Sequence, residues 1–152
     1  FRKWVGRTRA FAAALALPAA AQIGGLVNVK SSHDVATTAD RLESALLEKG
    51  ITVFARIDHA AGAQKIGQEL KPTLLIIFGS PAMGTPLMQR SRTMGIDLPL
   101  KALIWEDKAG TVWVTYNEPD YLVRRHGIIE MTDLIQQMGQ AQANFTQAAT
   151  SP

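Results

Sequence analysis

The chain has 152 residues, contains no cysteine, and carries a formal charge of +3 from 16 Lys and Arg against 13 Asp and Glu. Without cysteine, this chain has no disulfides, no thiolate metal sites and no cysteine nucleophile. Four of the basic residues lie in the first nine positions, and removing these four charges from +3 leaves −1, which gives no electrostatic case for binding a nucleic acid.

The N-terminal segment has the pattern of a cleavable signal peptide at residues 1–21. A basic start is followed by an uncharged, alanine-rich stretch that ends in Ala19 and Ala21, the small residues that a signal peptidase recognises. The apolar run is shorter than the about 20 residues that span a bilayer, and Pro18 interrupts a helix there. We therefore expect export to the bacterial periplasm or beyond, and a single mature domain over residues 22–152 without a transmembrane segment.

The first part of the mature chain predicts a strand, a helix and a second strand. The strands cover 25–32 and 51–59, where apolar and polar side chains alternate or β-branched residues dominate. Between them, four apolar residues share one helical face: Val35, Ala39, Leu42 and Leu46. We expect Ser31 or Ser32 to cap this helix and Gly50 to end it in a left-handed turn.

The middle of the chain predicts a buried strand between helices. A shorter helix at 60–71, ended by a proline, leads to the compact apolar run 73–79. Because that run is apolar throughout, we expect it to be the central strand of the sheet. Ser80 and Thr85 each stand directly before a proline, a pattern that predicts two helix starts in tandem.

The last part of the chain predicts a hairpin followed by two helices. Strands at 98–107 and 111–117 flank a tight turn, and a short helix follows at 118–127. A terminal amphipathic helix begins at Thr132, with its inward face formed by Leu134, Met138, Ala141 and Phe145. The final residues, 146–152, are expected to fray. Together these elements predict an α+β domain, with an antiparallel or mixed sheet and helices packed on one face.

The turn after the strand at 73–79 is the main candidate for a binding site. It half-matches a phosphate loop but lacks the lysine, so nucleotide hydrolysis is not expected. A glycine-containing turn that leads to a helix suits an anion, and methionines provide an adaptable apolar surface. The candidate binding residues are Ser80, Met83, Gly84, Thr85, Met88 and Arg90. The alternative is that the glycines and prolines only shape the turn and the methionines belong to the core.

A second candidate site combines Asp58, His59 and Asp107. These side chains would support metal or acid/base chemistry if the fold brought their strand ends together. The sequence spacing matches no metal motif, and Asp58 also suits a helix cap and Asp107 a turn. We therefore assign no catalytic residue, no metal and no cofactor.

Several linked motifs resemble the family catalogued as domain of unknown function 302. The motifs are Phe78-Gly79-x-Pro81, Gly84-Thr85-Pro86-Leu87-Met88, Asp97-Leu98-Pro99-Leu100-Lys101, Glu106-Asp107 with Tyr116, and Asp58-His59-Ala60. The resemblance covers roughly residues 26–127. It implies an α+β domain of TATA-box-binding-like topology, β-α-β(4)-α in outline, often forming a homodimer. It does not imply DNA binding, because a fold does not carry a function.

Three classes of function stay open at this point. The leading expectation is a non-catalytic binding or interaction domain that forms a homodimer and has a small ligand or an envelope protein as partner. The first alternative is an enzyme of unknown type that uses Asp58, His59 and Asp107. The second is a structural or stress-related envelope protein.

Overall fold

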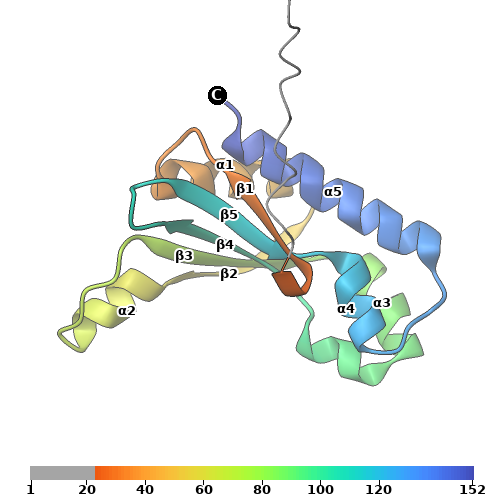
Figure 1. Cartoon of the computed structure of the whole chain (residues 1–152). Helices are drawn as coiled ribbons and strands as arrows, with labels where there is room; N and C mark the ends of the chain where they lie inside the picture. Colours follow the sequence, from red (N-terminus) through yellow and green to blue (C-terminus); the bar gives the residue numbers. More distant parts are fainter. Residues whose placement is uncertain (1–22) are drawn as a thin grey trace, which may run out of the picture.

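The strands form one antiparallel sheet. The computed structural model of the protein describes residues 23–152, and the predicted signal peptide lies outside that range. Five strands stand in the order β1-β5-β4-β3-β2, so the first strand pairs with the last (Figure 1). The bounds are Leu26–Lys30 for β1, Thr52–Asp58 for β2, Thr73–Gly79 for β3, Leu100–Glu106 for β4 and Val112–Asn117 for β5, and a short 3-10 turn, η1, covers Ile23–Gly25.

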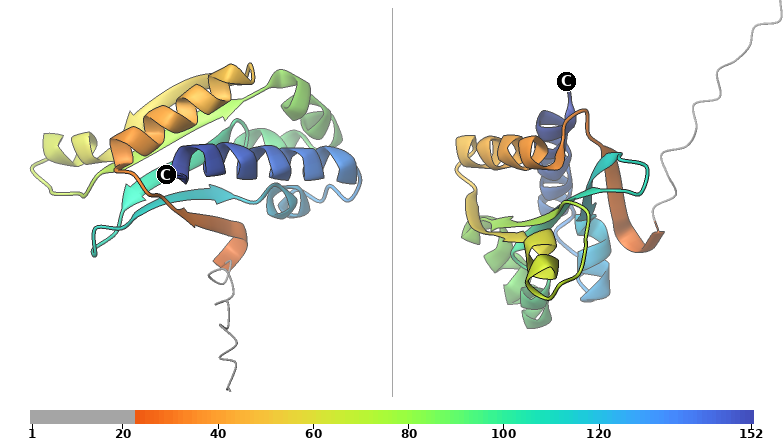
Figure 2. Two further views of the ribbon diagram at one scale, coloured as in Figure 1. Left: turned by 90° about the horizontal axis from the view of Figure 1, so that it is seen from above. Right: turned by 90° about the vertical axis from the view of Figure 1, so that its left-hand side faces the viewer.

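Helices cover one face of the sheet and extend from both of its ends. α1 (Val35–Glu48) and α5 (Thr132–Thr150) lie side by side on that face, as Figure 2 shows. α2 (His59–Lys65) projects from one end, and the other end carries α3 (Pro81–Arg90) and α4 (Pro119–Arg125). The predicted α+β fold is confirmed. Its main elements follow one another in the order β-α-β(4)-α, and α2, α3 and α4 are additional helices inserted between them.

α1 is held at both ends by local contacts that its sequence provides. All four residues of the predicted apolar face are buried. The cap, however, is Asp34 and not Ser31 or Ser32: its Oδ1 accepts from the Thr37 amide at 2.7 Å, and this bond lowers the pKa of the carboxyl. Ser31 instead shares a buried hydrogen bond of 2.7 Å with Thr38. Gly50 has φ +69°, as the predicted left-handed turn requires.

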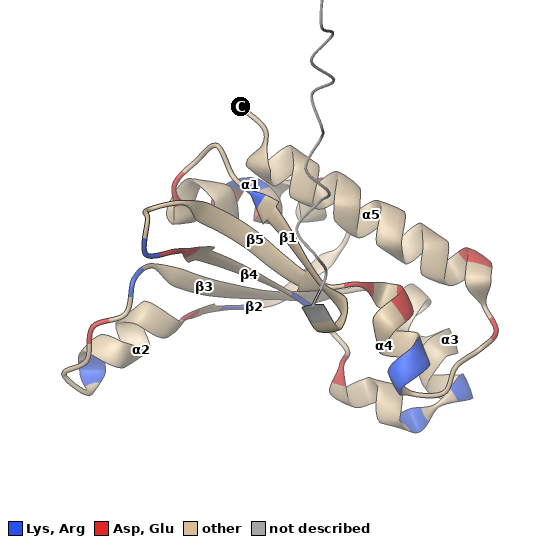
Figure 3. Cartoon of the chain, viewed as in Figure 1, with Lys and Arg blue, Asp and Glu red and all other residues tan. Residues whose placement is uncertain are grey.

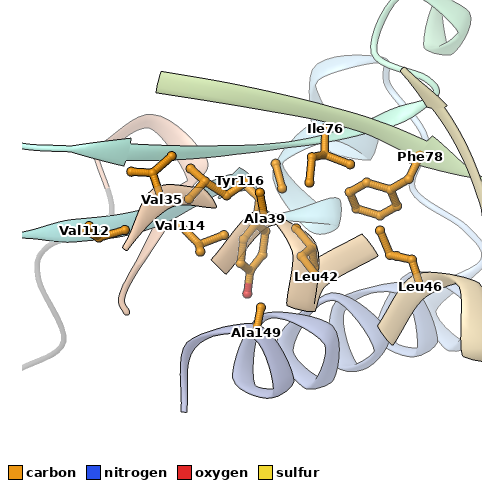
Figure 4. Packing of buried hydrophobic residues seen from close by; sticks show 12 residues of the cluster. Val35, Ala39, Leu42, Leu46, Ile76, Phe78, Val112, Val114, Tyr116 and Ala149 are labelled. Carbon is orange, nitrogen blue, oxygen red and sulfur yellow. The ribbon is translucent and has the colours of Figure 1, made fainter. Parts of the chain in front are cut away.

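The main core lies between α1, α5 and the covered face of the sheet. Figure 4 shows Leu42 and Leu46 of α1 directed toward Ile76 and Phe78 of β3. Tyr116 of β5 extends its ring across this core toward α5. Burial raises the pKa of the Tyr116 phenol above its ordinary value, so the hydroxyl stays protonated while it hydrogen-bonds Thr146.

A second apolar cluster packs at the α3–α4 end of the sheet. Its buried members are Leu87, Met94, Leu122, Val123, Ile128 and Met138. They come from α3, α4, α5, the loop after α4 and the 3-10 helix η2 (Arg92–Ile96). His126 joins η2 to α4, because its Nε2 lies 2.5 Å from Asp97 Oδ2 and its Nδ1 lies 2.9 Å from Thr93 Oγ1.

Two predictions about the middle of the chain are wrong. β3 is an interior strand, but the middle strand of the sheet is β4. The residues of β3 that face away from α1 and α5, Leu75 and Ile77, are half-buried apolar side chains, and this explains the uninterrupted apolar run. The two tandem helix starts are one continuous helix, α3, in which Pro86 lies at an interior position.

The ends of two helices also differ from the prediction. α2 ends at Lys65, where the chain turns at Gly67 with φ +71°, well before the proline expected to stop it. α5 does not fray over 146–150, because Ala149 and Thr150 are buried and the Ser32 amide donates to the Thr150 carbonyl at 2.9 Å. Among residues 23–152, no helix is both long enough and apolar enough to cross a membrane.

Substitutions in β3 test which face of the sheet is buried. Ile76 is fully buried against α1, whereas the next residue, Ile77, points to the opposite face. We expect Ile76→Asp to lower the free energy of unfolding by about 4 kcal/mol or more, since the carboxylate would lie unpaired in the core. Urea denaturation measures this. Ile77→Asp is the control and should cost clearly less; equal losses would show that the two faces of β3 are not buried as described.

Candidate functional site

A cavity of about 260 Å³ lies where the two apolar clusters meet. Its walls are the end of β3, α3, the segment that enters β4, the middle of α5, and two residues at the β2 edge. The lining residues are Ile51, Phe54, Phe78, Gly79, Ser80, Pro81, Met83, Gly84, Thr85, Met88, Leu98, Pro99, Leu100, Met138, Ala141, Gln142 and Phe145. The cavity is therefore almost wholly apolar.

The wall from α3 leaves room because one of its helical residues is glycine. Gly84 is not among the residues with positive φ, so the backbone there does not require glycine. A Cβ at this position would lie 3.4 Å from Leu98 Cδ1 and 3.8 Å from Met88 Cε. Both neighbours line the cavity, so any larger side chain at Gly84 would project into it.

Gln142 is the polar group that the cavity encloses. Gln142 is only 3% exposed, yet neither its Oε1 nor its Nε2 has a hydrogen-bond partner among the described residues. A buried side-chain amide can accept at the oxygen and donate twice from the nitrogen, and leaving these groups unpaired costs about 1–3 kcal/mol. Unpaired buried polar groups are rare in native structures, so this one calls for an explanation.

No charge contributes to the cavity. Within the described part of the chain, the lining includes no Asp, Glu, Lys, Arg or His. α5 has a single charged residue, Asp133 in its first turn, and Figure 3 shows the rest of the helix in the colour of residues that are neither acidic nor basic. A charged ligand would lose its hydration there without gaining an opposite charge, so the cavity favours a neutral molecule.

Five of the six candidate binding residues line this cavity. Ser80, Met83, Gly84, Thr85 and Met88 all contribute to the α3 wall. Arg90 does not, since its guanidinium faces outward and lies 3.1 Å from the Glu130 carboxylate. The expected caps are absent: Ser80 precedes α3 without a side-chain cap bond, and Thr85 lies inside the helix. The Ser80 carbonyl starts the helix instead, accepting from the amides of Met83 and Gly84.

Two residues of the second candidate site, Asp58 and Asp107, have local structural roles, and the third, His59, is exposed as the first residue of α2. Asp58 caps α2 by accepting from the Ala61 amide at 2.9 Å, as its alternative role predicted. Asp107 holds the β4–β5 turn, where its carboxylate accepts from the Ala109 and Thr111 amides and from Trp113 Nε1, and the bond to Trp113 is the main cause of its lowered pKa. Over residues 23–152, no group of three His, Asp or Glu side chains is placed to hold a metal ion.

A second hollow of about 520 Å³ lies between α4 and α5. Its lining includes charged side chains, and two of them, Asp120 and Arg124, pair with each other at 2.8 Å. Ile129 at its rim is 91% exposed. This hollow holds no buried group that lacks a partner, so the cavity at Gln142 is the stronger candidate for a ligand site.

The sequence of the last helix contains a second pattern, which includes Gln142 and differs from the predicted apolar face. Met138, Gln142, Thr146 and Thr150 recur every four residues, and all four are buried. The face that packs inward is thus partly polar, and it is rotated from the predicted face of Leu134, Met138, Ala141 and Phe145. Thr146 and Thr150 find hydrogen-bond partners, whereas Gln142 does not.

Replacing Gln142 with an apolar residue of similar size is expected to stabilise the protein. Gln142→Met removes the unpaired amide, so the free energy of unfolding should rise by about 1–3 kcal/mol. Guanidinium denaturation of ligand-free protein measures the change. Gln137→Met, at an exposed position of the same helix, is the control and should change stability by less than about 0.5 kcal/mol. A loss of stability in Gln142→Met would show that the amide is satisfied in the folded protein.

The chain is similar to proteins that are considerably longer. It is 52% identical over 104 residues to the "Fluoride-specific ion channel FluC 1" of Brucella suis biovar 1 (strain 1330), a match that covers 68% of this chain and 41% of that protein. The protein of the same name in Brucella abortus biovar 1 (strain 9-941) matches at 52% identity over 38% of its length. The chain thus spans about two fifths of the length of these relatives.

The fold also matches a solved structure. The crystal structure of the uncharacterized conserved protein DUF302 from Bacillus stearothermophilus superposes with a TM-score of 0.74 at 18% identity, covering 82% of this chain and 98% of that one. Independently, residues 27–145 match the family described as "Domain of unknown function DUF302". This match covers most of the chain and confirms the resemblance found in the sequence motifs. The chain belongs to the DUF302 family.

Proposed function

We propose that this chain is an exported, non-catalytic protein that binds a small, largely apolar molecule in the cavity between α3 and α5. The observation that supports this most directly is the buried amide of Gln142, unpaired at the wall of an otherwise apolar cavity. Protein interiors are normally packed without such space, and a buried polar group normally has a partner. A bound molecule accounts for both departures together.

The cavity is partly open to solvent, and its volume indicates how large a part of the ligand it can enclose. An apolar cavity of about 150 Å³ holds benzene. By proportion, a cavity of 260 Å³ accommodates a body of about ten non-hydrogen atoms. Met83 and Met88, with flexible thioether side chains, allow the wall to adapt to the shape of this body. A monocyclic or short-chain molecule fits this description, and any larger molecule would extend out of the open side of the cavity.

The proposal includes a homodimer. The sheet face opposite α1 and α5 carries several half-buried apolar side chains: Leu75, Ile77, Leu103, Trp105 and Trp113. At the β2 edge, Phe54 and Ile57 are 56% and 39% exposed. Exposed apolar surfaces of this kind favour association. An enzyme that uses Asp58, His59 and Asp107 is the weaker proposal, because both carboxylates already serve as local hydrogen-bond acceptors.

Native mass spectrometry of the exported protein tests the proposal in one measurement. We expect the mass of a dimer of residues 22–152, with a small molecule retained on each subunit. Gly84→Leu should fold normally, since leucine favours a helix over glycine, but should lose the small molecule because its side chain fills the cavity.

The matched control is Gly62→Leu, which makes the same change in α2, where an added Cβ meets nothing within 4 Å. This variant should retain the small molecule. The proposal fails if wild type carries no molecule after gentle purification and binds no apolar probe, or if Gly84→Leu retains the molecule as well as Gly62→Leu does. A monomer with a bound molecule would remove only the dimer from the proposal.

A second candidate function is that the chain acts together with a fluoride-specific ion channel. It is supported by the match to part of two longer Brucella proteins that carry that name. A domain that occurs within one polypeptide in some species can serve as a separate partner of the same machinery in others. The exported location proposed above would place the chain beside a membrane protein.

Growth in fluoride tests this second function. Deleting the gene in the bacterium that encodes the chain should lower the fluoride concentration that stops growth, and expressing the wild-type chain should restore it. Growth in equal concentrations of chloride is the control for general salt stress. If the deletion strain and its parent tolerate the same fluoride concentration, the proposed link to the channel is wrong.

A further inference from the structure

The cavity volume indicates the size of the ligand, and the chemistry of the Gln142 side chain indicates which functional group the ligand carries. This step rests on the proposed function, because it assumes that a molecule occupies the cavity. A primary amide carries a hydrogen-bond acceptor, the oxygen, and a donor, the nitrogen, on the same planar carbon. Both atoms are buried and neither is paired within residues 23–152. A ligand that satisfies both at once needs an adjacent donor and acceptor of its own.

We infer that the ligand carries an uncharged carboxamide or lactam group, which pairs with the Gln142 side chain through two parallel hydrogen bonds, on an apolar body of about ten non-hydrogen atoms in all. Such a group presents N–H and C=O on the same edge with the spacing that Gln142 itself has. The pairing forms in either orientation of the glutamine amide. An ether or a tertiary amide only accepts, so it leaves the Gln142 oxygen unpaired.

A carboxylate is disfavoured by two independent features of the site. It accepts hydrogen bonds but donates none, so the oxygen of Gln142 would remain without a donor. It would also carry its charge into a lining without Lys, Arg or His in the part of the chain that the structure describes. The anion-binding role that the glycine-containing turn suggested is therefore not the role that this lining suits. Arg90, the cation expected for it, lies outside the cavity and pairs with Glu130.

The hydroxyl groups at the cavity complement an amide without replacing Gln142. Ser80 and Thr85 line the same cavity, and neither hydroxyl caps α3. A primary carboxamide has a second N–H and a second lone pair, which remain after it has paired with Gln142. These two hydroxyls are the remaining polar side chains of the lining. The polar content of the cavity thus matches one neutral amide group, and the rest of the lining matches its apolar body.

Four probes of equal heavy-atom number separate the head group from the body. They are octanamide, its isomer N,N-dimethylhexanamide, octanoate, and butylbenzene. Affinities are measured by isothermal titration calorimetry with the purified mature protein at pH 8, where octanoate is ionised. We expect octanamide to bind wild type at least about tenfold more tightly than its dimethyl isomer or octanoate, a difference of about 1.4 kcal/mol or more.

Measurements on variants test whether Gln142 causes the preference for octanamide over its dimethyl isomer. In Gln142→Met, the ratio of octanamide to N,N-dimethylhexanamide affinities should fall below about twofold, while butylbenzene binds at least as tightly as it does to wild type. Gln137→Met, on the exposed side of the same helix, should keep the wild-type ratio. A Gln142→Met variant that keeps the preference would overturn the inference, because the head group would then be recognised elsewhere.

The outcomes also distinguish this inference from the function on which it rests. If wild type binds butylbenzene and the two amides equally, the apolar site is real and the inferred head group is wrong. If octanoate binds most tightly, the ligand is an anion and the inference is wrong in the same way. If the purified wild type carries no molecule and no probe binds it, both the proposed function and this inference are wrong.

Discussion

The position of α5 determines how the rest of the domain is arranged. This one helix of 19 residues, about 28 Å long, packs against both apolar clusters. Leu134, Ile135 and Met138 contact the α3–α4 cluster, while Phe145 and Ala149 contact the sheet core. The cavity lies between these two sets of contacts, and Gln142 is part of its lining. The candidate site therefore lies where α5 passes from one apolar cluster to the other.

The strands and most helices could be predicted from the sequence because local pattern and tertiary burial agree there. The apolar face of α1 and the β4–β5 hairpin are examples. Prediction failed where a tertiary contact decided the outcome. Pro86 resembles a helix start, but the Ser80 carbonyl had already begun the helix one turn earlier. The order of the strands depends on partners far away in sequence, and the apolar character of β3 does not reveal that β4 lies between it and β5.

The candidate site was predictable in part. Its α3 wall was found because glycine, proline and methionine cluster in sequence after β3, and such clusters mark turns and adaptable surfaces. Gln142 was missed because a search for apolar residues at helical spacing passes over a buried polar residue. Arg90 was included on sequence proximity alone, and a helix rotates neighbouring side chains away from one another. The burial of Gln142 and the lack of a hydrogen-bond partner for its amide both depend on the tertiary structure, so the sequence does not reveal them.

The pairing of β1 with β5 has a consequence for how the chain is made. Leu26 lies opposite Asn117, so the first strand has no place in the sheet until nearly the whole domain has been synthesised. Contacts between such distant residues form slowly, because a long loop must close before they are made. β2, β3 and β4 each pair with the next strand in the chain, so these strands and β5 can pair in order as they emerge. β1 has no partner until β5 has emerged, and its pairing with β5 completes the sheet.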